Sequence, residues 1–137
     1  MKKLLFTFLI ILLLSFNQDN YKHIGEWQGN DETGQVGTLI LDKNNNITFK
    51  IGNETMGGND FVINGIKAEL KYEIDYSKIP IEIDFVGYEK GNTLEKGRMK
   101  GIIKFVSDDK LEMASNFNDE RPENFNENSI VLNKIKL

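Results

Sequence analysis

The sequence contains no cysteine, and its 137 residues include only one histidine and one tryptophan. Without cysteine the chain forms no disulfide, carries no thiol nucleophile and offers no attachment point for a lipoprotein anchor. A single histidine without cysteine leaves no recognisable catalytic triad, Cys–His pair or histidine metal site. We therefore expect a non-catalytic domain with no metal or cofactor, stabilised by its apolar core alone.

Long apolar runs are also scarce, and the one at the start of the chain is short. Two lysines precede an apolar segment of eleven residues, Leu4 to Leu14, and the chain turns polar at Asn17. A membrane span needs about 20 apolar residues, so this pattern is typical of a secretory signal peptide. We predict a signal peptide at residues 1–17, a domain at residues 21–137 and a periplasmic or secreted protein. The alternative is a retained N-terminal anchor.

Acidic residues outnumber basic residues in this chain. The formal net charge is −4, and removal of Lys2 and Lys3 from the 17 basic residues leaves 15 against 21 acidic ones, a charge of −6. A negative domain repels phosphate backbones and anionic lipid surfaces. We expect no nucleic-acid partner and, after signal cleavage, no membrane association.

The mature sequence shows the period-two alternation of β-strands and no sustained helical period. Apolar or small residues at positions 99, 101, 103 and 105 alternate with Lys100 and Lys104, and the alternation restarts at Leu111 after a turn at Asp108-Asp109. Similar short segments follow one another along the chain, with turn residues between them. The connections that we predict are loops at 42–46 and 52–60, a hairpin turn at Asn64-Gly65 and one helical turn at 76–79.

About eight such strands predict an all-β domain, an antiparallel up-and-down barrel of lipocalin-like form. Closing a one-sided sheet around its apolar face removes its edges, and a barrel of this size is nearly filled by side chains or holds one small ligand. The residues predicted to face the interior are Leu39, Leu41, Phe49, Ile51, Leu70, Tyr72, Ile83, Phe85, Ile103, Phe105, Leu111 and Leu132. The residues predicted to face solvent are Lys50, Lys71, Glu82, Lys100 and Lys104.

Trp27, Arg121 and Phe125 are the candidate binding residues. Trp27 follows Gly25 on the opening strand, and we favour a core residue that plugs one end of the barrel over one that lines a ligand pocket. Arg121 is one of only two arginines and is fixed by Pro122. A guanidinium can stack on a ring and donate several hydrogen bonds, so we favour a structural role against Trp27 over an anion-binding role at a pocket mouth.

Acidic residues offer weaker candidates. Asp42-x-Asn44-x-Asn46 resembles the start of a calcium loop, but Ile47 and Asn53 stand where Gly and Glu are required, and we interpret it as a hairpin loop. Four carboxylates fall on predicted wet faces and are interpreted as solvated charges: Glu69, Glu73, Glu82 and Asp84. A further one, Asp75, ends a strand and is predicted to cap the turn that follows.

A series of short motifs runs along the domain in the order Gly25-x-Trp27, Tyr72-x-Ile74-Asp75, Pro80-x-x-x-Asp84, Gly101-Ile102, Leu111, Arg121-Pro122-x-x-Phe125 and Val131-Leu132. This order resembles a family of uncharacterised exported bacterial domains, first described in Planctomycetes and regarded as lipocalin-like, over nearly all of residues 24–135. Those domains usually carry an aromatic residue after Gly-Ile, where this chain has Ile103. The family carries no established activity.

More distantly, the Gly-x-Trp start resembles lipocalins and avidins. In those barrels the Trp packs at the closed end, often under an Arg from late in the chain. The resemblance implies that role for Trp27 and Arg121, and it implies a small apolar ligand.

Three classes of function remain open. The first is an exported non-catalytic barrel that binds a small, partly apolar molecule, and a continuous apolar cavity of about 300 Å³ or more would favour it. The second is an interaction module with a side-chain-filled barrel that presents loops 52–60 and 116–128 to a protein or glycan. The third is a hydrolase with carboxylates at the barrel mouth, which buried carboxylates of raised pKa would favour.

The export pattern makes a direct prediction. The apolar segment ends at Leu14 and the polar switch comes at Asn17, so we expect the mature protein to start between about residues 16 and 21. Terminal sequencing of the exported protein measures this start, and a chain that retains Met1 in the periplasmic fraction would contradict it.

Overall fold

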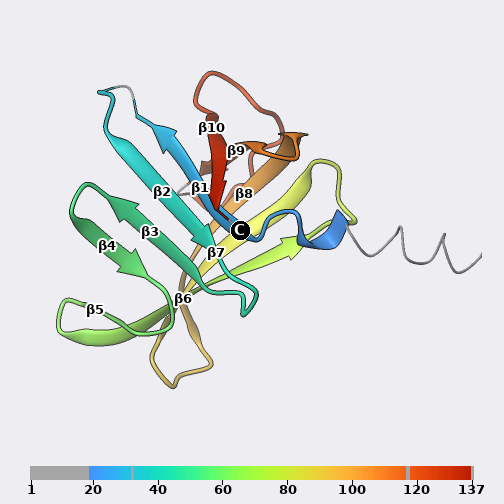
Figure 1. The fold of residues 1–137 in the computed structure, drawn as a ribbon. Coiled ribbons are helices and arrows are strands. Elements are labelled where there is room, and N and C mark those ends of the chain that lie inside the picture. Colours follow the sequence, from blue (N-terminus) through green and yellow to red (C-terminus); the bar gives the residue numbers. More distant parts are fainter. Residues whose placement is uncertain (1–18, 32, 117, 137) are drawn as a thin grey trace, which may run out of the picture.

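The computed structural model describes residues 19–136 except 32 and 117, so the predicted signal peptide lies outside the described residues. A short 3-10 helix, η1 (Asp19–Tyr21), precedes ten strands (Figure 1). The strands are β1 (Gly25–Asn30), β2 (Val36–Leu41), β3 (Ile47–Ile51), β4 (Glu54–Gly57), β5 (Phe61–Ile63), β6 (Ile66–Asp75), β7 (Ile81–Glu89), β8 (Glu95–Ser107), β9 (Lys110–Asn116) and β10 (Ile130–Lys136). Within the described part of the chain, no helix has the length and apolar character to cross a membrane.

The strands form one antiparallel sheet in the order β4-β3-β2-β1-β10-β9-β8-β7-β6-β5. The sheet curls until β3 meets β6 at a seam, where Asn46 and Lys71 form a bridge and the Tyr72 amide donates to the Asn45 carbonyl at 2.9 Å. The predicted all-β up-and-down barrel is confirmed. Its strand number is ten instead of about eight, and two short strands, β4 and β5, extend the sheet edges beyond the seam.

Turn chemistry explains these two short strands. The predicted loop at 52–60 is wrong in part, because Gly52 takes a positive φ of 59° and lets Ile51 pair with Glu54 across a two-residue turn. That pairing creates β4. The predicted turn at Asn64-Gly65 is confirmed, since both residues have the positive φ (49° and 79°) that a type I′ hairpin turn requires.

The connection between β6 and β7 is an irregular turn, so the helical turn predicted at 76–79 is wrong. An Asp75 carboxylate oxygen accepts hydrogen bonds from the Ser77 amide at 2.9 Å and from the Ser77 hydroxyl at 2.6 Å. The side chain thus completes a turn without helical backbone bonds, which confirms the predicted capping role of Asp75.

The interior agrees with the predicted alternation at all but one position. One cluster of buried side chains comprises Trp27, Leu39, Leu41, Ile47, Tyr72, Ile83, Phe85, Ile103, Leu111, Met113 and Leu132. Three further predicted residues pack against this cluster while partly buried: Phe49, Leu70 and Phe105. Ile51 is 52% exposed, because it ends β3 beside the turn. The five residues predicted outside are all exposed or partly exposed.

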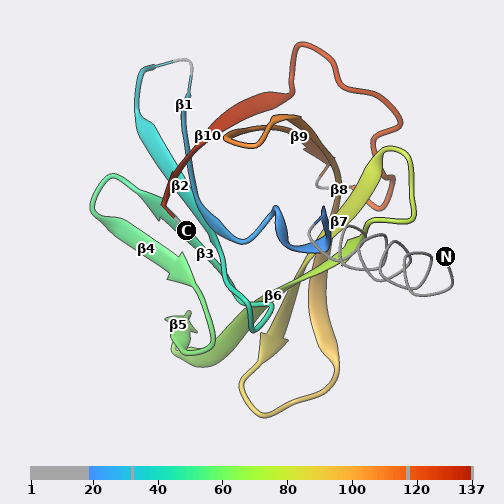
Figure 2. The same cartoon turned by 45° about the vertical axis from the view of Figure 1, so that its right-hand side comes forward.

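The segment before β1 crosses one end of the barrel, as Figure 2 shows. Here the Trp27 indole is fully buried and donates a hydrogen bond to the His23 carbonyl at 2.8 Å. This end is filled by side chains, and we call it the closed end.

The corrected interior predicts a contrast between two isoleucines. Ile103 is fully buried, so Ile103→Ala should lower the free energy of unfolding by about 2–5 kcal/mol. Ile51→Ala, at the exposed end of β3, should cost less than about 1 kcal/mol. Urea denaturation measures both, and similar losses for the two variants would contradict this division of the interior.

Candidate functional site

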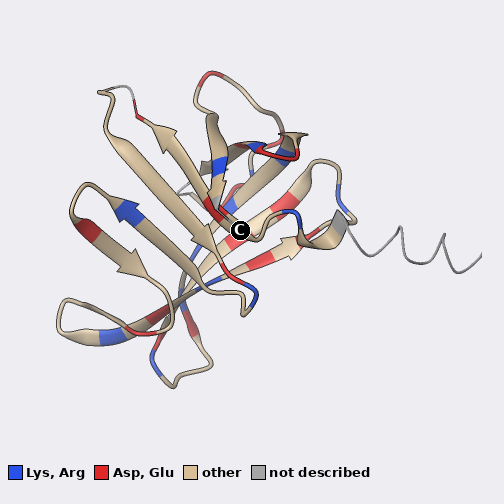
Figure 3. Cartoon of the chain, in the orientation of Figure 1, with Lys and Arg blue, Asp and Glu red and all other residues tan. Residues whose placement is uncertain are grey.

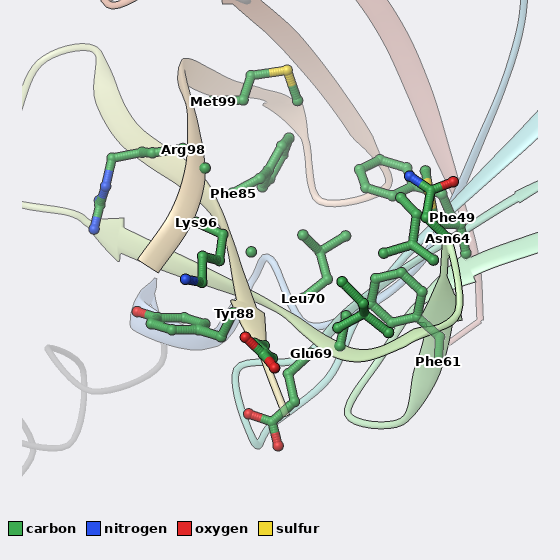
Figure 4. Close-up of a pocket in the computed structure, with 17 residues that line it drawn as sticks. Phe49, Phe61, Asn64, Glu69, Leu70, Phe85, Tyr88, Lys96, Arg98 and Met99 are labelled. Carbon is green, nitrogen blue, oxygen red and sulfur yellow. The ribbon is translucent and has the colours of Figure 1, made fainter. Parts of the chain in front are cut away.

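The end of the barrel opposite the closed end is hollow. A cavity of about 730 Å³ opens there, and side chains from every strand in the series β3 to β8 line it (Figure 4). Its apolar walls are formed by Phe49, Met56, Phe61, Ile63, Ile66, Leu70, Phe85 and Met99. A space of this size and character suits a small apolar molecule.

Two glycines leave room for this cavity. Gly87 and Gly97 pair across β7 and β8 and continue the inward-facing series of Phe85 and Met99. A Cβ atom placed on Gly97 would meet nothing within 4 Å, and one on Gly87 would meet only the Gly97 carbonyl oxygen, at 4.0 Å. A larger residue at either position would extend into the cavity.

The cavity lies where the two edges of the sheet separate. The Leu70 amide donates to the Gly58 carbonyl at 2.8 Å, and beyond this bond β6 pairs with β5 while β3 pairs with β4. Met56 of β4 and Phe61 of β5 therefore line the cavity from two strands that do not pair with each other.

Charged groups stand at the rim. Glu69 lies 3.6 Å from the Lys90 ammonium and 3.9 Å from that of Lys71, and Lys96 lines the same mouth. Arg98 also belongs to the wall, but its guanidinium reaches away from the cavity in Figure 4. The site thus has an apolar interior and a polar entrance.

A hydrogen-bonded network around His23 holds the closed end. The Tyr72 hydroxyl donates to the Asp42 carbonyl at 2.5 Å, so it is free to accept a hydrogen bond from Nε2 of His23, 3.1 Å away. Nδ1 of His23 lies 2.6 Å from the Tyr76 hydroxyl and accepts a hydrogen bond from it. This pattern fits the neutral imidazole, because a protonated Nδ1 could no longer accept the hydrogen bond from the Tyr76 hydroxyl.

The charge state of His23 follows from this surrounding. Burial, together with the positive charge of Lys134, lowers the pKa of His23 from its ordinary 6.5 to about 4. Burial likewise raises the pKa of Tyr72 to about 12, with help from the charge of Asp42. Both side chains are neutral near pH 7 and serve the fold.

The structure corrects the expectation that Asp84 is a solvated charge. It lies on the outer side of β7, as predicted, yet it is buried and not solvated. The two arginines of the chain converge on it: Arg98 donates to one carboxylate oxygen at 2.7 Å and Arg121 to the other at 2.6 Å. Burial alone would raise the pKa of Asp84, but the hydrogen bonds from Arg121 and Arg98 outweigh it and lower the pKa.

The connection between β9 and β10 explains that burial. Arg121 comes from this connection and also donates to the Gly101 carbonyl at 2.8 Å, while its Nε lies 3.3 Å from Glu82. Lys100 donates to the Asp119 carbonyl at 3.1 Å. The segment is thereby tied to the outer face of β7 and β8. Basic and acidic positions both occur along the strands of the sheet (Figure 3).

None of the three candidate binding residues lines the cavity. The expected contact of Arg121 with Trp27 is wrong: Arg121 binds Asp84 on the outer face, and the cation above the indole is Lys134, 5.1 Å from the ring centre. The Phe125 ring lies under Lys104, at 4.6 Å. Three cavity-wall residues, Phe49, Leu70 and Phe85, were predicted to face the interior. Met56 was missed because it lies in the predicted loop at 52–60, where the structure has strand β4.

The Asp42 loop behaves as a hairpin connection. A carboxylate oxygen of Asp42 accepts hydrogen bonds from the amides of Asn44 at 2.8 Å and Asn46 at 2.9 Å. These bonds close the turn between β2 and β3. Across residues 19–136, apart from the two positions left undescribed, the structure holds no group of three His, Cys, Asp or Glu residues suited to a metal.

Comparisons with family models, with curated proteins and with solved structures found no match for this chain. The resemblance to exported lipocalin-like domains therefore stays a prediction.

The His23 network predicts a specific acid response. The pKa of His23 is about 4 in the folded chain and about 6.5 when unfolded, so only the unfolded state binds the extra proton between these values. The free energy of unfolding should therefore be highest, as far as His23 is concerned, above about pH 6.5. It should fall as the pH drops toward 4, by about 3 kcal/mol at most. Urea unfolding from pH 7.5 to 4.5 measures it.

His23→Gln provides the control for this response. Its stability should be lower at pH 7.5 but should vary less with pH across the same window. Asp84, whose pKa is lowered, loses its contribution below about pH 4 and leaves this window undisturbed. An unchanged slope in His23→Gln would contradict the assignment to His23.

Arg121 supports a second stability prediction. Arg121→Lys keeps the positive charge but loses the planar guanidinium that contacts Asp84, Gly101 and Glu82. We therefore expect a loss of about 1–3 kcal/mol in the free energy of unfolding. Lys100→Arg is the matched control, since Lys100 contacts one backbone carbonyl on the same face and should change by less than about 0.5 kcal/mol. An unchanged denaturation midpoint for Arg121→Lys would discard the structural role.

Proposed function

We propose that this protein is a non-catalytic binding barrel that holds a small, partly apolar molecule in the cavity between β3 and β8. The observation that carries the proposal is the volume of about 730 Å³, well above the roughly 300 Å³ at which ligand cavities begin. Apolar walls favour an apolar body in the ligand, and the charged rim around Glu69 and Lys96 favours a polar end. The N-terminal sequence pattern favours a location in the periplasm or outside the cell for this activity.

The runner-up, an interaction module with free loops, receives less support. It requires a barrel filled by its own side chains, whereas the open end is hollow. It also relies on two loops, of which residues 52–60 include strand β4 and residues 116–128 are tied to the barrel through Arg121 and Asp119.

A carboxylate hydrolase is supported least. The buried carboxylate, Asp84, lies outside the cavity, and two guanidiniums lower its pKa. A general acid needs the opposite shift.

Binding of the fluorescent neutral dye N-phenyl-1-naphthylamine tests the proposal. We expect saturable fluorescence enhancement with the wild-type protein. Gly87→Phe should weaken the dye affinity at least about tenfold, because the new ring occupies the cavity while the backbone accepts a side chain without a clash.

Lys50→Phe is the matched control. It adds the same ring on the exposed outer side of β3 and should leave the affinity unchanged. Equal affinities for wild type and Gly87→Phe would place the dye outside the cavity and reject the proposed site.

A further inference from the structure

The open end holds a second, smaller cavity beside the first. Its volume is about 210 Å³, and it lies between β1, β2 and β3 on one side and β9 and β10 on the other. Buried core residues form its apolar floor: Leu39, Met113 and Leu132. We call the two spaces the main and the minor compartment.

Phe49 separates the compartments. Among the described residues, it alone lines both. It projects inward from the middle of β3, paired with Leu39 of β2 on one side and Met56 of β4 on the other. Leu39 borders the minor compartment and Met56 the main one, so the ring stands on the boundary.

The ring is held in this position by an aromatic contact inside the barrel. Phe49 meets Phe85 of β7 edge to face, with ring centres 5.8 Å apart and planes at 80°. Phe85 is buried and borders only the main compartment. The pair forms a partition, and removal of the Phe49 ring would join two apolar spaces into one.

We propose that Phe49 sets the maximum length of the bound ligand, and that the ligand class is an elongated alkyl or acyl chain. This inference rests on the proposed function. With the partition in place, a chain that enters by the rim near Glu69 and Lys96 ends inside the main compartment. Without it, the chain continues across the barrel interior into the minor compartment, against Leu39 and Met113.

A series of straight-chain alcohols of increasing length, displacing N-phenyl-1-naphthylamine, tests this proposal. Each buried methylene should tighten binding roughly fourfold until the chain fills the available space. In the wild-type protein we expect the gain to stop at the length that fills the main compartment. In Phe49→Ala the gain should continue over at least about two further methylenes.

Two controls isolate the partition. Phe61→Ala removes a ring of the same size from the wall of the main compartment without opening the minor one, so any gain in stopping length should be smaller than in Phe49→Ala. Gly37 lines only the minor compartment, and a Cβ atom there meets nothing within 4 Å. Gly37→Leu in the Phe49→Ala background should therefore return the stopping length to the wild-type value.

The outcomes separate the two proposals. Binding that keeps the wild-type stopping length in Phe49→Ala would overturn the partition alone. Failure of the wild-type protein to bind any alcohol or the dye would overturn both. If Phe49→Ala does not fold, Phe49→Leu retains apolar volume, loses the aromatic contact with Phe85 and should show the same shift to a smaller degree.

Discussion

The short seam between β3 and β6 decides what the rest of this barrel can be. The two ends of the sheet meet where Asn45 and Asn46 reach Lys71 and Tyr72, and where the Leu70 amide donates to the Gly58 carbonyl. On one side of this contact the wall is closed, and side chains from every direction fill the interior around Trp27. On the other side β4 and β5 carry the edges apart, and the interior is a cavity.

The same seam is joined to the hydrogen-bonded network of the closed end. Tyr72 donates its amide to the seam and its hydroxyl to the Asp42 carbonyl, and it also contacts His23. The closed end is therefore fastened by a buried polar network in addition to apolar packing. Such a network is stable when every member has its partner, which the neutral His23 provides.

The sequence predicted the class of fold and nearly all of the core, because period-two alternation reports directly on which side of a sheet is buried. It could not report the hollow end. Gly87 and Gly97 lie at inward positions, and in a sequence an inward glycine looks the same as a loop glycine. Asp84 was misjudged for a related reason. Alternation places it on the outer face, but only the fold brings Arg121 from a distant connection to cover that face.

The edge strands β4 and β5, beyond the seam, affect how the protein behaves in solution. Unpaired backbone groups on a sheet edge are templates for strands of other molecules, and long apolar edges lead to aggregation. β4 and β5 span only four and three residues, and Gly57, Gly58 and the Asn64-Gly65 turn interrupt the extended backbone at their ends. The barrel can thus remain open on one side while exposing too little regular edge for another chain to extend the sheet.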